Sequence, residues 1–190
     1  MPRGILMTIG HSTLPSEVFL AALKENGCEL LVDVRRYPGS RRHPQFGQER
    51  LFASLAEVGI RGLWREGLGG RRKPRLDSAN TAWRNEAFRG YADYMQTPEF
   101  TAEIDWLVQQ VKTASVAVMC AEAVPWRCHR SLIADAILAR GFAVEDIFVS
   151  ADGSSSRKLH LLPNFAYIEH GCVSYPGEPE PQAELFRSRG

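Results

Sequence analysis

The feature that most constrains the fold of this chain is a series of short, continuous apolar runs separated by helical patterns. Residues 5–9, 30–34, 115–120 and 144–149 are runs of this kind, and several are rich in β-branched side chains. Strands buried on both faces lack the apolar–polar alternation of strands with one wet face. The pattern therefore predicts a three-layer αβα fold of Rossmann-like type, with a mostly parallel central sheet and helices on both faces.

Helical periodicity fills the intervals between these runs. Pro15 and Pro98 each suit the first turn of a helix, and further helices are expected over 48–58, 86–96 and 129–140. Several of these segments are followed by Gly, which commonly ends a helix. The alternation of strands and helices predicts parallel strands joined by helical crossovers.

The remaining segments give weaker signals. Residues 60–64 are predicted as a short strand and residues 152–157, "DGSSSR", as a loop. The length of 190 residues suits one domain, which we place at residues 1–165. Residues 166–190 include "YPGEPEPQ" and are expected to form an extended tail with little order.

Composition favours a cytoplasmic protein without membrane contact. No apolar run approaches the roughly 18 residues that a membrane span needs. The first apolar run is too short for a signal peptide. Four cysteines, none of them in a Cys-x-x-Cys pair, do not form a disulfide framework.

Charge is distributed unevenly along a chain whose net charge is only +1. Residues 35–75 hold eleven Lys or Arg side chains and three Glu, a local net charge of +8, so the rest of the chain carries −7. Such a segment favours an anionic small molecule or a nucleic acid as partner. The alternative is a basic surface that pairs with acidic helices of the same chain.

Side chains that can take part in catalysis or ligand binding stand at the ends of four of the predicted strands. They are His11, Ser12, Asp33, Arg35, Cys120, Glu122 and Asp152. In a parallel sheet the carboxyl ends of the strands lie at one edge, and ligands of such folds bind there. We therefore expect these side chains to form one shared site.

Asp33, Glu122 and His11 are the candidate proton carriers of this site. Carboxylates and an imidazole between cations are typical of hydrolysis and group transfer. Asp33 lies inside an apolar run, where a carboxylate needs a partner, and Arg35 and His11 are the nearest candidates. A structural alternative is one buried ion-pair network that organises loops without chemistry. Its members would be Asp33, Arg35, Glu122 and Arg130.

Other residues near this edge are candidates for binding an anion. Arg130 follows His129 at the expected start of a helix, where a cation opposes the helix dipole, so a role in holding a carboxylate or phosphate explains it better. "LGG" (68–70) precedes a basic run but lacks the pattern of a P-loop. The other candidate binding residues are Ser12, Arg35, Ser40, Gly69, Gly70 and His129.

Two cysteines fall in the segment "CAEAVPWRCHR" (120–130). A Cys at a strand end invites comparison with thiol phosphatases and sulfurtransferases, but the phosphatase spacing would need Arg at position 126, which is Trp. A zinc site would use Cys120, Cys128 and His129, yet adjacent ligands rarely converge and no fourth ligand has suitable spacing. We keep Cys120 as a candidate catalytic thiol and interpret Cys128 as a small buried residue. No metal and no cofactor are predicted.

Four segments resemble motifs of the domain of unknown function 488 family. They are "TIGHST" (8–13), "LVDVRRYPGSRRHPQF" (31–46), "LGG" (68–70) and "CAEAVPWRCHR" (120–130). They occur in the family's order and cover about residues 6–150. The resemblance implies an α/β fold and a bacterial, cytoplasmic protein whose activity is not settled. It maps the motif residues onto Gly10, His11, Ser12, Asp33, Arg35, Pro38, Ser40, Pro44, Phe46, Leu68, Gly69, Gly70, Cys120, Glu122, Cys128, His129 and Arg130.

The sequence therefore predicts an enzyme, a hydrolase or transferase that acts on a phosphate-containing ligand such as a nucleotide or nucleic acid. One alternative is a non-catalytic binding module that stacks bases on Tyr37, Phe46 and Trp64. Another is a thiol- or metal-dependent enzyme that uses Cys120. Asp33 and Glu122 favour an enzyme, because carboxylates repel phosphate and serve little purpose in a pure binder.

Overall fold

The central sheet of the computed structural model, which describes residues 4–39 and 42–177, has six strands in the order β3-β2-β4-β1-β5-β6. They are β1 (Ile5–Gly10), β2 (Leu30–Asp33), β3 (Arg61–Trp64), β4 (Val116–Cys120), β5 (Ala143–Val149) and β6 (Ser155–Leu159). Every neighbouring pair is parallel except β5 and β6. The predicted mostly parallel sheet is confirmed.

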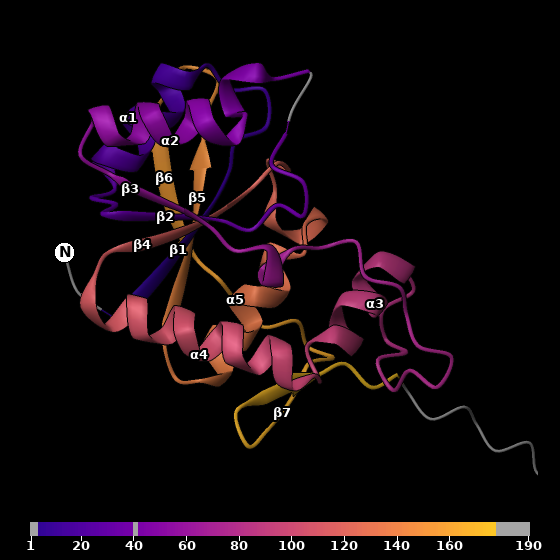
Figure 1. The fold of residues 1–190 in the computed structure, drawn as a ribbon. Coiled ribbons are helices and arrows are strands. Elements are labelled where there is room, and N and C mark those ends of the chain that lie inside the picture. The colour runs from indigo at the N-terminus through magenta and orange to yellow at the C-terminus, as the bar shows by residue number, and fades with distance from the viewer. Residues whose placement is uncertain (1–3, 40–41, 178–190) are drawn as a thin grey trace, which may run out of the picture.

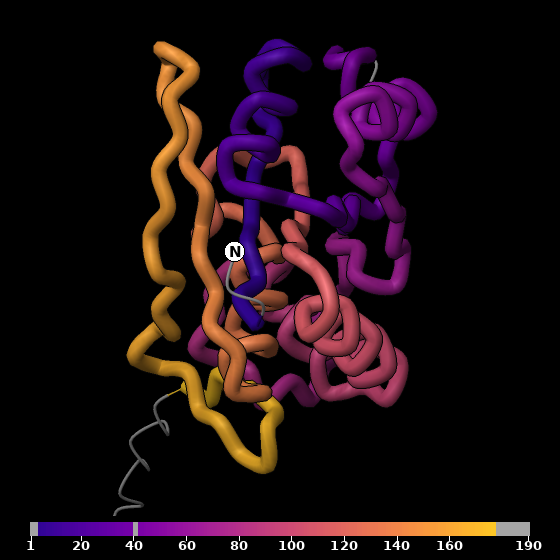
Figure 2. Tube along the Cα trace, turned by 90° about the vertical axis from the view of Figure 1, so that its left-hand side faces the viewer, coloured from indigo at the N-terminus to yellow at the C-terminus, as the bar shows by residue number. Residues whose placement is uncertain are grey.

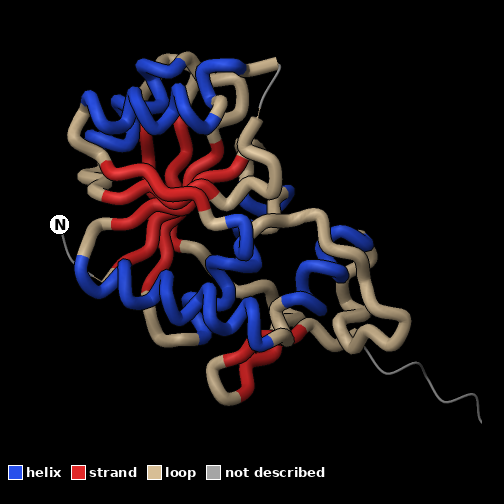
Figure 3. Tube along the Cα trace, in the orientation of Figure 1, coloured by secondary structure: helices blue, strands red, loops and turns tan. Residues whose placement is uncertain are grey.

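Helices cover both faces of the sheet (Figure 1). One face carries α1 (Ser16–Glu25) and α2 (Gln48–Glu57), and the other carries α4 (Pro98–Thr113) and α5 (Arg130–Ala139). The three layers are clear when helices and strands are coloured separately (Figure 3). The remaining α-helix, α3 (Glu86–Tyr94), lies to one side of α5. Three short 3₁₀ turns complete the helical segments: η1 (Pro44–Phe46), η2 (Glu66–Leu68) and η3 (Pro125–Arg127).

The strands divide their side chains between two hydrophobic cores. Met7 of β1 packs in the core beneath α1 and α2, whereas Leu6 packs in the core beneath α4 and α5. This alternation follows from the pleat, which sends successive side chains to opposite faces. At the strand ends it assigns Cys120 to the α4–α5 core, together with Val118, the residue two positions before it.

Two segments expected to be irregular are ordered. Residues 155–159 overlap the predicted loop but form β6 along the edge of the sheet, beside β5 (Figure 2). The hairpin of β7 (Tyr167–Glu169) and β8 (Cys172–Ser174) lies within the predicted tail. The expectation of little order is wrong for residues 166–177, because Tyr175 is fully buried and its hydroxyl donates to Asp135 at 2.6 Å. Residues 178–190 lie outside the described residues.

Across the described residues, no helix has both the length and the apolar character needed to span a bilayer.

Candidate functional site

A cleft crosses the edge of the sheet at which β1, β2 and β4 end. Two cavities of about 280 and 490 Å³ form this strand-end cleft. Their shared walls are Arg35, Tyr37, Ala121, Glu122 and Arg127. We call the smaller cavity the cysteine half, because Cys120 and Cys128 line it, and the larger cavity the His11 half. Cavities of this size suit a small molecule.

Three of the four predicted strand ends meet in this cleft. His11 follows β1, Arg35 follows β2, and Cys120 ends β4. Asp152, after β5, does not line it; its carboxylate is exposed and accepts hydrogen bonds from the backbone and hydroxyl of Ser154. The expected convergence therefore holds for the neighbouring strands β1, β2 and β4, whereas β5 lies on the far side of β1 from β4.

Arg130 lies beneath the loop of residues 121–124 rather than in the cleft. Its side chain is fully buried, donating from Nε to Thr8 Oγ1 and from its two terminal nitrogens to the carbonyl oxygens of Glu122 and Ala123. Each guanidinium nitrogen thus has an internal acceptor. The expectation that Arg130 binds an external anion is corrected: this cation fixes the loop from below.

The first three carbonyl oxygens of the loop of residues 121–124 are all held by hydrogen bonds from outside the loop. Ala121 O accepts from the Ser12 backbone N–H at 2.8 Å, and Arg130 holds the next two carbonyls. The backbone N–H groups of Ala121 and Glu122 help to lower the pKa of Cys120. Gly10 lets this loop approach the end of β1 closely, since an added Cβ at Gly10 would lie 1.8 Å from Glu122 O. Backbone contacts from both sides therefore set the geometry around Cys120.

Asp33 and Arg35 form a buried ion pair, as expected from the position of Asp33 in an apolar run. Arg35 donates to the Asp33 carboxylate from Nε at 2.9 Å and from Nη2 at 2.6 Å, and Nη2 also donates to Phe46 O at 2.8 Å. Asp33 has no exposed surface. Its carboxylate therefore holds Arg35 at the cleft wall, and as a proton carrier it has no direct path to a ligand.

His11 is a neutral imidazole that orients the same arginine. Its ring stacks on Phe46 with centroids 4.1 Å apart, and Nε2 faces Arg35 Nη1 at 3.5 Å. Because Arg35 can only donate, Nε2 accepts, and the proton resides on Nδ1, which donates to Ser12 O at 2.9 Å. Burial and then the Arg35 charge lower the pKa of His11 to about 4. His11 therefore lines its half of the cleft as a neutral group at neutral pH.

Cys120, Cys128 and His129 converge on the cysteine half. Their sulfur and ring-nitrogen atoms all lie within 4.8 Å of one another, with His129 Nδ1 4.0 Å from Cys120 Sγ and 3.7 Å from Cys128 Sγ. Cys128 is extended (φ −134°, ψ 142°) and His129 is helical (φ −57°, ψ −16°). This change of backbone conformation brings adjacent side chains to one point. The expectation that neighbouring residues here do not converge is wrong.

The two thiols differ in acidity. A hydrogen bond from Cys128 lowers the pKa of Cys120, and the Arg130 charge and two backbone N–H groups add to this effect against the opposing effect of burial. The same pairing and burial raise the pKa of Cys128. Cys120 is therefore the sulfur that carries negative charge more readily, which agrees with its selection as the candidate reactive thiol.

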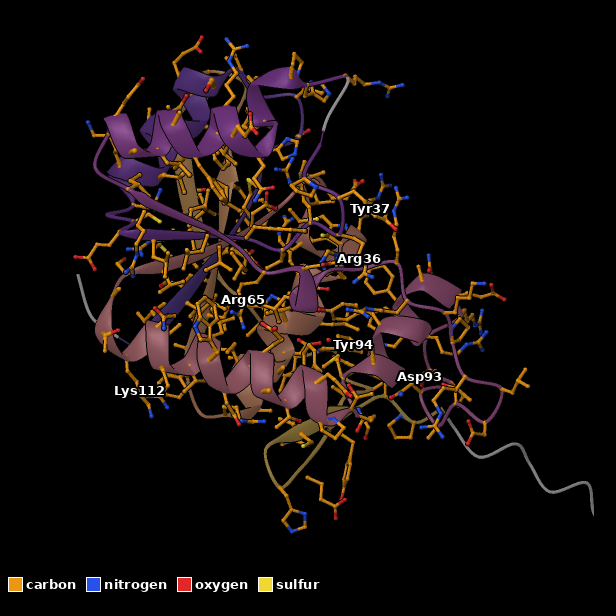
Figure 4. The ribbon with its side chains drawn as sticks, viewed as in Figure 1. Arg36, Tyr37, Arg65, Asp93, Tyr94 and Lys112 are labelled. Atoms are coloured by element: carbon orange, nitrogen blue, oxygen red, sulfur yellow. The ribbon has the colours of Figure 1, made fainter. Side chains whose placement is uncertain are left out.

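Sequence reasoning missed most of the cationic wall of the cleft. Arg36 and Arg71 line the cysteine half, Arg42 lines the His11 half, and Arg127 lines both. Arg36 and its neighbour Tyr37 lie above α3 in Figure 4. Arg36 pairs with an exposed Glu66 at 3.4 Å, whereas the other three form no ion pair with any residue in the described ranges. The +8 segment contains three of these four residues, and that charge was the available signal.

The small residues have mixed roles. Ser12 lines the His11 half with a left-handed backbone (φ 45°), which is strained for a side chain other than Gly. Gly70 lines the cysteine half, and an added Cβ would lie 2.8 Å from His129 Nδ1. Gly69 does not line the cleft; its missing Cβ leaves room for Arg36 and the Glu66 carbonyl. Ser40 lies outside the described residues.

Glu122 is exposed at the mouth of the cleft and lines both halves. Within the described ranges its carboxylate forms no ion pair, and Arg130 binds only its carbonyl oxygen. The single buried network considered as a structural alternative is therefore not formed. Asp33 and Arg35 pair with each other, while Arg130 is bound elsewhere.

A second buried network runs from Arg130 through Thr8, Asp146 and His160 to Asp135 of α5. Thr8 Oγ1 accepts from Arg130 and donates to Asp146, whose carboxylate also binds His160. His160 Nδ1 and Nε2 lie 2.9 Å from Asp146 and Asp135, respectively. Burial alone would lower the pKa of His160, but the two carboxylates outweigh it and raise the pKa to about 9. His160 is therefore an imidazolium at neutral pH.

This network predicts a loss of stability in alkali. Since the folded-state pKa of His160 is about 9 and the unfolded value 6.5, its contribution is complete below pH 6.5 and disappears as pH rises towards 9. We expect the free energy of unfolding to fall by about 3 kcal/mol over that interval. Urea denaturation of wild type and His160→Gln measures it, and the variant should lack this fall. An equal fall in the variant would assign the pH dependence to other groups. His170→Asn, at an exposed hairpin position, is the matched control.

Comparison with known proteins identifies a family but no relative of known activity. The model of the family described as "Domain of unknown function DUF488" matches residues 15–137, well over half of the chain. No curated protein and no solved structure matches the sequence.

Proposed function

Since the chain belongs to the DUF488 family, whose description assigns no activity, we propose a function from the cleft itself: an enzyme that hydrolyses or transfers a group of a phosphate-containing, anionic small molecule. The observation that carries this proposal is the cationic lining of the strand-end cleft around Cys120 and beside Glu122. Arginines without acidic partners bind oxyanions by paired, charge-assisted hydrogen bonds.

The proposed substrate is small rather than a nucleic acid strand. Of the three aromatic residues expected to stack on bases, Phe46 is fully buried against His11, and the Trp64 ring N–H donates to Arg35 O at 2.9 Å. Tyr37, 65% exposed, is the only one of the three that projects from the surface. One exposed ring suits a nucleotide, whereas strand binding uses a row of stacking side chains.

Two groups at the cleft are the proposed catalytic residues. Cys120 lies at the floor of the cysteine half, and the Glu122 carboxylate lies at its mouth. A carboxylate beside a cationic wall disfavours the binding of an anion, so its presence there is best explained by a role in proton transfer. We assign Glu122 the proton transfer, and the arginines the orientation of the anion.

Removal of one unpaired arginine should weaken anion binding. We expect Arg127→Gln to raise the dissociation constant for inorganic pyrophosphate at least tenfold, because a charge-assisted hydrogen bond contributes about 1.5–3 kcal/mol. Isothermal titration of the full chain measures this value. Arg61→Gln is the matched control, since Arg61 is exposed at the opposite, amino end of β3. Equal affinity in Arg127→Gln and wild type would contradict the proposal.

The enzymatic part has its own test. Glu122→Gln should bind pyrophosphate at least as tightly as wild type, because a repelling charge is removed, but release p-nitrophenolate from p-nitrophenyl phosphate roughly 100-fold more slowly. Tight anion binding with no turnover by the wild-type chain would instead indicate a non-catalytic binding module.

A further inference from the structure

We propose that Cys120, Cys128 and His129 bind one thiophilic divalent metal ion of the zinc class, with an open coordination position that faces the cysteine half of the cleft. This inference rests on the proposed function, because it identifies how Cys120 takes part in it. Three independent observations carry the inference: the distances between the ligand atoms, the hydrogen bond that orients His129, and the cavity beside the cluster.

The ligand atoms are already close to the spacing that a metal ion requires. Tetrahedral zinc with bonds of about 2.3 Å to sulfur and about 2.0 Å to nitrogen places sulfur and nitrogen ligands roughly 3.5 Å apart. His129 Nδ1 lies 3.7 Å from Cys128 Sγ and 4.0 Å from Cys120 Sγ. Shifts of about 1 Å or less would bring the three atoms, which all lie within 4.8 Å of one another, into coordination distance of one ion.

The imidazole of His129 is held in the form that binds metal. Its Nε2 lies 3.0 Å from the Val34 carbonyl oxygen, which can only accept, so Nε2 carries the proton. The Nδ1 lone pair is therefore directed at the two sulfurs. Metal-binding histidines characteristically donate their other N–H to a carbonyl or carboxylate in this way.

The scaffold around the three ligands is rigid. Cys120 ends β4 and pairs in register with Gly10, and Cys128 and His129 directly precede α5. Cys120 and Cys128 are 8% and 4% exposed. The absence of a side chain at Gly70 leaves space next to His129 Nδ1. Ligands held on secondary-structure ends need little rearrangement on binding.

The donor set selects the metal. Two thiolates and one imidazole suit zinc and similar soft or borderline ions, whereas magnesium and calcium require oxygen ligands. Within the described ranges, no fourth His, Cys, Asp or Glu joins the cluster. Three protein ligands with one open position characterise catalytic zinc, which binds a water molecule or a substrate oxygen there.

The open position faces the cationic wall of the cleft. Arg71 and Arg127 line the same cavity as the three ligands, and Glu122 lies at its mouth. An oxyanion held by the arginines would therefore present an oxygen to the metal. Where a water molecule took that position instead, Glu122 would be the carboxylate of this cavity that accepts its proton.

Metal analysis of the full chain tests the site. After reconstitution with zinc and gel filtration, we expect about one zinc ion per wild-type chain, and less than about a tenth of that in Cys128→Ser and His129→Gln. Cys172→Ser, which removes an exposed thiol, should keep full occupancy. Zinc retained equally in the cluster variants, or not retained by wild type, would overturn the proposal.

A measurement on the wild-type chain avoids any folding defect in the variants. Zinc should slow alkylation of Cys120 and Cys128 by iodoacetamide at least tenfold, as followed by peptide mass spectrometry. Cys172 should react at the same rate with and without zinc. Unprotected alkylation of Cys120 in the presence of zinc would contradict the site and favour a free thiol nucleophile.

Failure of the metal site is distinguishable from failure of the proposed function. Pyrophosphate affinity that depends on Arg127 in chelator-treated protein would preserve the anion site even if zinc does not bind. Zinc binding without any pyrophosphate affinity would preserve the metal site and overturn the proposed function.

Discussion

Replacement of Arg130 with Met is expected to lower the free energy of unfolding by about 3 kcal/mol. The guanidinium is fully buried and donates to three acceptors in two segments of the chain: Thr8 in β1, and the Glu122 and Ala123 carbonyls of the loop. Met fills a similar volume but leaves the two loop carbonyls without their donors. Part of this loss is offset, because folding of the Met variant no longer requires a charged group to be removed from water. Urea denaturation followed by circular dichroism measures the change.

Two further variants separate the geometry of Arg130 from its charge. Arg130→Lys keeps the charge but should recover little of the lost stability, because one ammonium cannot span both carbonyls in the way a guanidinium fork does. Arg127→Met, at an exposed position in the adjacent η3, should stay within about 0.5 kcal/mol of wild type. Full recovery in Arg130→Lys would show that the charge alone matters.

The second large effect is expected at Asp33. Asp33→Ala should lower the free energy of unfolding by about 3–5 kcal/mol, because it leaves the buried Arg35 without its carboxylate. The double variant Asp33→Leu/Arg35→Met should lose clearly less than the single variant, since neither position then holds an unpaired charge. Urea denaturation of wild type and the two variants measures these differences. A double variant less stable than Asp33→Ala would contradict this account of the pair.

Most strands of the central sheet, and the helices that cover it, were predictable because each has its own local pattern of apolar and capping residues. β4 is an uninterrupted apolar run, and Thr97 and Pro98 begin α4 as their residue types predict, with Thr97 Oγ1 accepting from Phe100 N–H. β6 has the sequence "SSRKL" and is mostly exposed, so no apolar pattern distinguishes it from a loop. β7 and β8 have three residues each, too few to show a period.

The candidate site was predictable only in outline. The carboxyl ends of parallel strands share one edge of a sheet, so the sequence could predict that His11, Arg35 and Cys120 lie there. The direction of each side chain does not. Arg130 turns inward beneath its loop, and Cys128 and His129 converge because the backbone changes from extended to helical between them. These outcomes depend on tertiary contacts that residue spacing does not encode.

The central claim is that the strand-end cleft binds an oxyanion on its arginine wall. A crystal of the full chain soaked in tungstate, measured at the tungsten absorption edge, tests it most directly. We expect an anomalous peak in the cysteine half, within hydrogen-bonding distance of at least one of Arg36, Arg71 and Arg127. Tungstate bound elsewhere on the protein, with no peak in the cleft, would contradict it.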